Sequence, residues 1–407
     1  MKAIHCIYKV MGVLRKIRTR YSGIMNLIYK QLKLMFICFL FLSISINNIA
    51  IDGEGFFILD EVNSSLSEED ESSEILCIQD GYLYLNMWNF SEPYMSYNYV
   101  KIIDVHQPDN PVITGIIEFE NGESLVAITI KENIAYILME LWVLCYDRYF
   151  LTLVDITDPA NPVRLGNSTT ETIVTFRAES PQNLRVYKNY TYVSADELFI
   201  FDCSNHTLPV KVNNLASTGG ELHIKNDFLY LVYSGVRIYN LVDPVHPLLL
   251  GEVNSTKQFS VGSGVYGDYV VNVFREFGLE SYDCTDPAHP NICWDYIFPS
   301  WKIGITGIVH DTEIVEDRLF AGGDRLYIFN IRKPQKPKRI AWIHISDHNI
   351  TRIMVENNYL YLTIQNNITI YSYLENSLER NIGLGIGIPL SVVIGISVVF
   401  WWKKKRR

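Results

Sequence analysis

Residues 151–166 read LTLVDITDPANPVRLG, and this phrase decides the fold because it recurs along the chain. It opens with a short apolar run, which is typical of a buried strand. The segment Asp-Pro-Ala-Asn-Pro follows, and proline ends a strand because it fixes φ and has no backbone N–H to donate. A second apolar run, residues 163–165, ends at Gly166. The phrase therefore predicts two short strands joined by a tight turn.

The same phrase occurs in six full copies and a shortened seventh. Each copy has a marker residue at the end of its first strand: Asp104, Asp155, Asp202, Asn240, Asp283, Asn330 and, in the degenerate copy, Ser372. The markers are spaced by 51, 47, 38, 43, 47 and 42 residues. Upstream of each marker lies another pair of apolar runs, such as residues 184–186 and 191–193. Four short strands in about 40–50 residues are the signature of one propeller blade. We therefore predict an all-β fold, a β-propeller of seven blades with four short antiparallel strands each, followed by a single C-terminal transmembrane helix.

The two ends of the predicted ring complement each other. The seventh copy stops near Asn376 without its turn and last strand. Residues 55–59 (GFFIL), ahead of the first copy, read as an additional strand. We expect them to supply the missing strand, since ring closure removes an open sheet edge.

The phrase resembles the LVIVD repeat, found in surface or secreted proteins of bacteria and archaea, over about residues 75–373. Copies two, four and five keep the Asp-Pro-x-x-Pro core, whereas copy one has Gln-Pro, copy six has Lys-Pro, and copy three (SNHTLP) lacks the first proline. These departures leave the turn geometry of those copies open. The resemblance implies a propeller at a cell surface and implies no reaction.

Two apolar runs indicate a membrane protein. Residues 34–46 (LMFICFLFLSISI) have the length of a signal-peptide core and are shorter than the ~20 residues of a span. Residues 382–402 carry no charge, end in two tryptophans, and precede the basic tail KKKRR, which marks the cytoplasmic side. We therefore expect five segments: a signal peptide or membrane-targeting segment (1–50), a ring-closing strand and acidic spacer (51–75), the propeller (76–376), a transmembrane helix (382–402) and a cytoplasmic tail (403–407).

Charge and sequons support an extracellular body. Residues 51–402 carry 22 basic and 45 acidic side chains, a net charge of −23, which repels phosphate backbones and argues against nucleic acid as a partner. Eight N-x-S/T sequons are candidate glycosylation sites: Asn63, Asn89, Asn167, Asn189, Asn205, Asn254, Asn349 and Asn367.

The sequence contains no motif of known chemistry, so we expect no cofactor, no metal and no catalytic residues. Cys284 and Cys293 either form a disulfide across their turn or are buried thiols. His246 and His289 each follow an aspartate by three residues, which we interpret as repeat-turn residues rather than metal ligands. The acidic run 68–74 (EEDESSE) reads as a solvated spacer.

The best candidate for a binding surface is a pair of aromatic insertions between the second and third strands of the first two copies. The first insertion, residues 87–99, holds Trp88, Phe90, Tyr94, Tyr97 and Tyr99. The second, residues 139–149, holds Trp142, Tyr146 and Tyr149. Equivalent loops of adjacent blades share one face, so these rings are expected to form a common aromatic lip for a protein or a glycan. The alternative is a pair of long hairpins whose aromatic rings only pack on each other.

Three functions fit the sequence. The first is a membrane-anchored, cell-surface module that binds an extracellular protein or glycan through the candidate ligand residues Trp88, Phe90, Tyr94, Tyr97, Trp142 and Tyr146. The second is an extracytoplasmic hydrolase or lyase of polysaccharides, which requires two or three carboxylates that converge near the propeller axis. The third is a structural component of the envelope.

Overall fold

The computed structural model describes residues 48–377 except 53–54, 64–70, 93–94, 121, 144–145, 170–182, 196, 217–218, 258–259, 276–277, 297–308 and 347. The chain divides into two compact units. The larger unit consists of residues 50–53 and 61–374, and the other comprises 1–49, 54–60 and 375–407. The predicted signal segment 34–46 and span 382–402 lie outside the described residues. Within the described part, no helix is long and apolar enough to cross a membrane.

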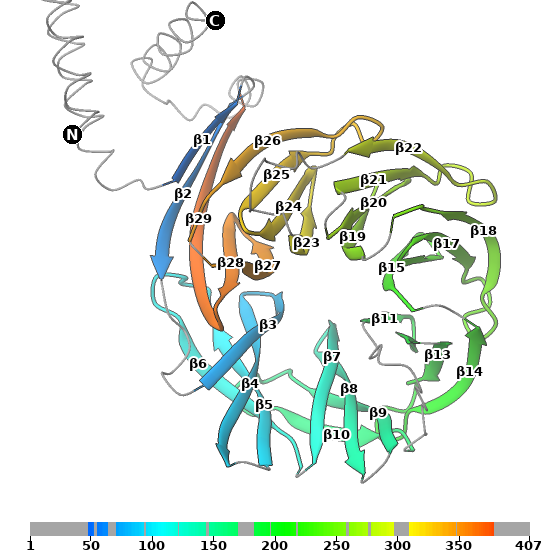
Figure 1. The fold of residues 1–407 in the computed structure, drawn as a ribbon. Coiled ribbons are helices and arrows are strands. Elements are labelled where there is room, and N and C mark those ends of the chain that lie inside the picture. The colour runs from blue at the N-terminus through cyan, green and yellow to red at the C-terminus, as the bar shows by residue number, and fades with distance from the viewer. Residues whose placement is uncertain are drawn as a thin grey trace, which may run out of the picture. The chain divides into compact units, whose positions relative to one another are not determined.

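Seven antiparallel sheets make up the propeller, and one edge strand of each sheet lies nearest the centre (Figure 1). The innermost strands are β3 (Glu71–Gln79), β7 (Glu123–Lys131), β11 (Asn183–Tyr187), β15 (Glu221–Lys225), β19 (Ser260–Tyr266), β23 (Val309–Val315) and β27 (Ile350–Glu356). The second strands are β4 (Tyr82–Glu92), β8 (Ile134–Val143), β12 (Tyr190–Ser194), β16 (Phe228–Val232), β20 (Tyr269–Phe274), β24 (Arg318–Gly323) and β28 (Tyr359–Ile364). The third strands are β5 (Met95–Asp104), β9 (Tyr146–Asp155), β13 (Glu197–Asp202), β17 (Gly235–Asn240), β21 (Gly278–Asp283), β25 (Leu326–Asn330) and β29 (Asn367–Ser377). The outer strands are β6 (Val112–Glu118), β10 (Val163–Asn167), β14 (Val210–Ala216), β18 (Leu248–Asn254), β22 (Asn291–Tyr296), β26 (Lys338–Ile343) and β2 (Gly55–Asn63).

Contacts between the innermost strands confirm a ring of seven blades. Each innermost strand contacts the innermost strand of the next blade, and β27 of the seventh blade contacts β3 of the first. The strand order of the seventh sheet is β1-β2-β29-β28-β27. Residues 55–59, which were expected to supply the closing strand, lie in β2, and β1 (Asn48–Asp52) is a further strand that the sequence did not suggest. At the end of β2, Val62 packs against Ile368 and Ile370 of β29.

The marker residues are Asp or Asn because their side chains build the turn. In all six full copies the marker Oδ1 accepts a hydrogen bond from the backbone N–H two residues later, as Asp155 does from Thr157 at 2.8 Å. The other five turns are the same: Asp104 with His106, Asp202 with Ser204, Asn240 with Val242, Asp283 with Thr285 and Asn330 with Arg332. Such Asx turns need only a side-chain carbonyl or carboxylate oxygen, so the copies without Asp-Pro keep this turn. Ser372 has no such role, because β29 continues past it.

The glycine that ends the phrase is required by the neighbouring blade. A Cβ on Gly166 would lie 2.1 Å from the carbonyl oxygen of Thr207, which belongs to the turn of the next blade. Gly115 and Gly251 meet the next turn in the same way, at Pro159 and Pro287. Each of these three turns thus packs on the outer strand of the preceding blade, and this contact limits how closely the sheets can approach.

The hydrophobic core lies between adjacent sheets. Leu151 and Leu153 of blade two, for example, pack with Val193 and Phe201 of blade three. The alternation of strand side chains places one set of residues against each neighbour, so every blade depends on two others for its burial.

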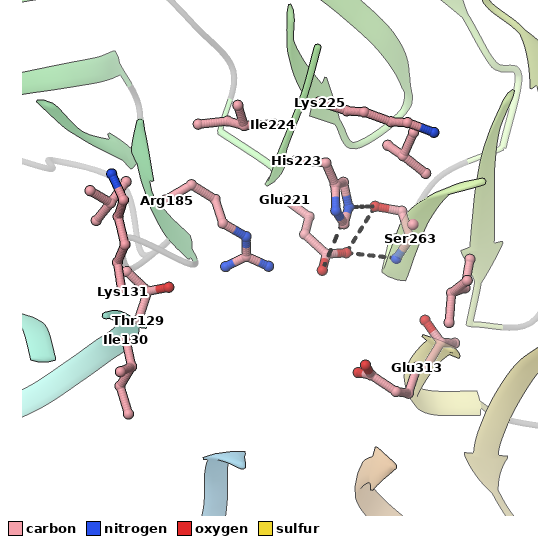
Figure 2. A pocket seen from close by; sticks show the side chains of 15 residues that line it. Thr129, Ile130, Lys131, Arg185, Glu221, His223, Ile224, Lys225, Ser263 and Glu313 are labelled. Carbon is pink, nitrogen blue, oxygen red and sulfur yellow. Dashed lines mark hydrogen bonds and ion pairs between the residues drawn. The ribbon is translucent and has the colours of Figure 1, made fainter. Parts of the chain in front are cut away.

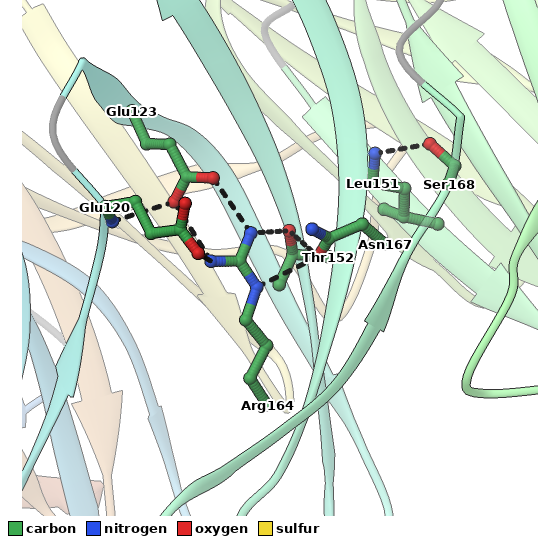
Figure 3. Close-up of polar contacts among 7 residues, drawn as sticks. All are labelled: Glu120, Glu123, Leu151, Thr152, Arg164, Asn167 and Ser168. Atoms are coloured by element: carbon green, nitrogen blue, oxygen red, sulfur yellow. Dashed lines mark hydrogen bonds and ion pairs between the residues drawn. The ribbon is translucent and has the colours of Figure 1, made fainter.

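A buried ion pair ties the outer strand of blade two to its inner strand (Figure 3). Arg164 of β10 donates from Nη1 and Nη2 to the two carboxylate oxygens of Glu123 of β7, at 3.1 and 2.9 Å. It also donates from Nε to Asn167 Oδ1 at 2.9 Å. The side chain of Glu123 is only 8% exposed, so this bidentate contact compensates for the burial of a charge.

Candidate functional site

The innermost strands of blades two to six surround a cavity of about 540 Å³ in the propeller channel (Figure 2). Its polar and charged lining residues are Thr129, Lys131, Arg185, Glu221, His223, Lys225, Ser263, Thr312 and Glu313. This volume falls within the ~300–1,000 Å³ of small-molecule sites, whereas the lining is far more polar than is usual for them.

The strand register explains why these side chains converge. Arg185, His223 and Glu313 each stand two residues before the end of an innermost strand, and Glu221 and Asp311 stand four before it. Alternate residues of a strand point to the same side, and this shared parity accounts for the presence of Arg185, Glu221, His223 and Glu313 in the cavity lining. Asp311 is not among the lining residues and accepts a hydrogen bond from Ile353 N of the next blade.

Blade five contributes glycine at both equivalent positions, Gly262 and Gly264. A Cβ on Gly264 would lie 2.5 Å from Ile314 Cδ1, and one on Gly262 would lie 2.2 Å from Thr312 Oγ1. The two glycines therefore allow β19 and β23 to approach closely and leave this part of the wall without side chains.

Glu221 is an ionised carboxylate held by its neighbours. Its Oε2 accepts hydrogen bonds from Ser263 N at 2.6 Å and from Ser263 Oγ at 2.9 Å, and its Oε1 lies 3.8 Å from His223 Nε2. Burial alone would raise the pKa of Glu221, but His223, Arg185 and the Ser263 hydroxyl outweigh burial and lower this pKa to about 2.

The contact among Ser263, His223 and Glu221 is a link between blades four and five, not a catalytic triad. His223 Nε2 lies 2.8 Å from Ser263 Oγ, which is within reach for a nucleophile and its base. In a triad, however, the carboxylate orients the far ring nitrogen of the histidine. Here Glu221 and His223 Nε2 approach the same hydroxyl.

Glu313 differs from Glu221 in having no partner. Among the described residues its carboxyl group makes no hydrogen bond and no ion pair, although it faces the cavity. Burial, with the nearby carboxylates of Asp311 and Glu221, raises the pKa of Glu313 to about 8. The acid is therefore mostly protonated at pH 7 and presents an O–H donor to the cavity.

Asp311 and Arg352 continue the charged ring around the channel. Burial raises the pKa of Asp311 to about 6, against the opposing effects of Arg352 and of the Ile353 N–H, which donates to Asp311 Oδ2 at 2.9 Å. Arg352 Nε in turn donates to Glu74 Oε1 at 2.6 Å. The interpretation of residues 68–74 as a solvated spacer is thus wrong for Glu74, which lies in β3 and bonds across the closure of the ring.

The cations of the cavity have different surroundings. Lys131 and Lys225 donate to backbone carbonyls in the hairpin turn of the next blade, Lys188 O and Gly267 O, both at 2.7 Å. Arg185 donates from Nη1 to the Leu184 carbonyl at 2.9 Å, and within the described chain this is the only hydrogen bond of its guanidinium. Its remaining N–H donors face the cavity (Figure 2).

The predicted aromatic lip lies on two long hairpins. The β4–β5 pairing extends to Glu92 and Met95, and the β8–β9 pairing extends to Val143 and Tyr146. Tyr94 lies outside the described residues, as do the side chains of Trp88, Phe90, Tyr97, Trp142 and Tyr146, so the lip stays a prediction. Tyr149 does not belong to it, because it is 3% exposed and donates to Glu140 Oε1.

The other predicted residues have local roles. Asn167, Asn189, Asn205, Asn254, Asn349 and Asn367 are exposed, as sequons must be, while the side chains of Asn63 and Asn89 lie outside the described residues. His246 Nδ1 lies 3.0 Å from Asp243 Oδ2, and His289 repeats this contact with Asp286 at 2.9 Å, within exposed turns. Neither turn lies in a group of residues suited to a metal ion in the described part.

The two thiols whose pairing was left open are free cysteines, so Cys284 and Cys293 do not form a disulfide.

No residue of the channel site was predicted from the sequence. The signal for this site was the pattern of the innermost strands: ELHIK (221–225) alternates polar and apolar residues, and HDTEIV (310–315) opens with four polar residues. That pattern identifies a half-polar strand and does not say which strands share an axis.

Comparison with known proteins supports the repeat. The LVIVD repeat matches residues 180–216, which span blade three, and this confirms the resemblance drawn from the sequence. No curated protein matches the chain. Among solved structures, the chain is similar to the crystal structure of the computationally designed Ika8 protein, with 9% sequence identity and a TM-score of 0.49, over 76% of this chain and 98% of that one.

Proposed function

We propose that this protein is a surface module that binds a small polar ligand in the channel cavity of its propeller. A β-propeller with an LVIVD repeat suggests a surface or binding module. The observation that carries the proposal is the pair of Arg185 and Glu313, half-buried groups that face one cavity from blades three and six; among the described residues the guanidinium makes one hydrogen bond and the carboxyl group makes none. A bound molecule would complete their hydrogen bonds.

A cavity-filling variant tests this proposal. Thr129 lines the cavity, so Thr129→Trp would place an indole in the ligand space. The matched control is Val242→Trp, at a turn position that is 77% exposed. We expect a screen of sugars, sugar acids and amino acids against the full-length chain in mild detergent, read by thermal shift, to find a ligand that stabilises the wild type and the control and not Thr129→Trp. Equal stabilisation of all three proteins would place the ligand elsewhere.

We further propose that the propeller stands outside a membrane on the span 382–402. Its support is the length of the uncharged run and the basic tail that follows it. Deletion of residues 382–407 should release the protein from membranes that retain the full chain during alkaline carbonate extraction. Retention of the shortened chain would contradict the proposal.

The aromatic hairpins are proposed as a second contact surface, for a protein or glycan at the cell surface. Their support is the insertion of aromatic residues at the same place in two adjacent blades. Full-length protein with Trp88, Tyr94 and Trp142 changed to Ala should lose a partner that the wild type captures from host surface extract. Capture of the same partner by both would make these residues structural.

A second candidate function is hydrolysis of a polysaccharide. It is favoured by the convergence of Glu221, Asp311 and Glu313, because a protonated acid beside an ionised one is the arrangement of a general acid and its charged partner. The two donors on Glu221 argue against it, since they make this carboxylate a weak base. New reducing ends released from polysaccharides by the wild type and not by Glu313→Gln would establish it.

A further inference from the structure

The cavity is cationic within an acidic protein. Residues 51–402 have a net charge of −23, yet the cavity lining holds Lys131, Arg185 and Lys225 against two carboxyl groups. One of these, Glu313, is mostly neutral at pH 7, so a single ionised carboxylate faces three permanent cations. Low-dielectric walls concentrate the field of such a group of charges, which favours an anion.

Arg185 is the cation that remains available. The two lysines are engaged with the carbonyls of neighbouring turns, and no carboxylate of the described residues lies within 4.0 Å of the Arg185 guanidinium. A guanidinium with open donors binds carboxylates and phosphates in a bidentate manner. The ionised acid, Glu221, already accepts two hydrogen bonds from Ser263 and contacts His223, so it offers little to a cationic ligand.

The rest of the lining suits hydroxyl groups. The Glu313 carboxyl presents a donor and an acceptor on the opposite wall (Figure 2). The Thr129 side chain also lines the space, whereas Thr312 Oγ1 is buried against Gly262. The Glu313 and Thr129 side chains form hydrogen bonds without needing a charge on the ligand.

We infer that the channel ligand is an acidic sugar, whose carboxylate binds Arg185 and whose hydroxyls bind Glu313 and Thr129. This inference rests on the proposed function of the cavity. Loss of a hydrogen bond between two charged groups corresponds to about a 10–100-fold change in affinity, which sets the expected preference over neutral sugars.

Isothermal titration of the full-length chain in detergent tests the inference. The ligands are glucuronate and galacturonate, their neutral counterparts glucose and galactose, the cationic sugar glucosamine, and glucose 6-phosphate. The variant Arg185→Gln removes the charge, and its loss of one hydrogen bond to the Leu184 carbonyl leaves the blade packing intact. Arg237→Gln is the matched control, because Arg237 pairs with Glu252 on the outer strands of blade four and does not line the cavity. Unfolding midpoints of all three proteins verify that each is folded.

The expected result is binding of both uronates at least tenfold tighter than the neutral sugars, with this preference lost in Arg185→Gln and kept in Arg237→Gln. Equal affinity for neutral and acidic sugars, or a preference that survives in Arg185→Gln, would overturn the acidic-sugar inference and leave the proposed binding function in place. If glucosamine bound most tightly, the cavity would be a site for cations and the acidic-sugar inference would be wrong. If glucose 6-phosphate bound most tightly, Arg185 would still be the anion-binding residue, but the ligand would be a sugar phosphate and the acidic-sugar inference would be wrong. Absence of binding by every ligand would overturn both the inference and the channel as a sugar site.

Discussion

Replacing Glu313 with glutamine should change how the stability of this propeller depends on pH. In the unfolded chain Glu313 has the ordinary glutamate pKa of 4.5. In the folded protein, burial and the carboxylates of Asp311 and Glu221 raise this pKa to about 8. Between these pH values the folded protein keeps a proton that the unfolded chain has released. The free energy of unfolding therefore falls as pH rises from 4.5 to 8. The contribution of Glu313 is fully present below that window and is lost above it.

The size of the effect follows from the same two values. The difference between a pKa of 4.5 in the unfolded chain and about 8 in the folded protein corresponds to roughly 4–5 kcal/mol of stability, which is lost as the pH rises through this range. Glutamine resembles the protonated acid in shape and cannot ionise, so Glu313→Gln removes this loss. The variant should match the wild type near pH 4 and exceed its stability by several kcal/mol at pH 8, with the largest difference at the highest pH.

Urea denaturation followed by tryptophan fluorescence at pH 4, 5, 6, 7 and 8 measures the difference. The matched control is Glu132→Gln, which alters an exposed turn residue and should follow the wild-type curve at every pH. If wild type and Glu313→Gln instead keep a constant difference from pH 4 to pH 8, Glu313 is ionised normally. The description of the cavity as holding a neutral acid would then be wrong.

Three further changes test the packing of the blades. Gly166→Ala places a methyl group 2.1 Å from Thr207 O, so a backbone must shift, and urea unfolding should show a loss of about 1–3 kcal/mol; an unchanged midpoint would contradict the role of this glycine. Asp155→Ala removes the Asx turn and should cost about 1 kcal/mol by the same assay, whereas Asp155→Asn should cost little because Asn240 and Asn330 build this turn in other blades. Arg164→Met leaves the buried Glu123 carboxylate without its bidentate partner and should lower the free energy of unfolding by about 2–3 kcal/mol; a smaller loss than that of Arg237→Met would refute this account.

Much of the fold was predictable because it is encoded locally. The apolar runs, the Asp-Pro turns and the repeated phrase identify strands and their connections without any distant contact, and the markers from Asp104 to Asn330 end the third strands where predicted. A strand at residues 55–59 was also predictable from its apolar run, and these residues lie in β2. The additional strand β1 was not predictable, because residues 48–52 have no repeat partner.

The channel site was decided by tertiary structure alone. Arg185, Glu221 and Glu313 belong to three different blades, and the repeated phrase does not include any of them. They converge because seven sheets close around one axis and because Gly262 and Gly264 leave a wall open. The pKa of Glu313 also depends on this closure, since only the ring brings the Glu221 carboxylate from blade four toward it. The alternation of residues along a strand specifies on which side of the strand a side chain lies. Which residues that side chain meets across the propeller axis depends on how many blades close the ring.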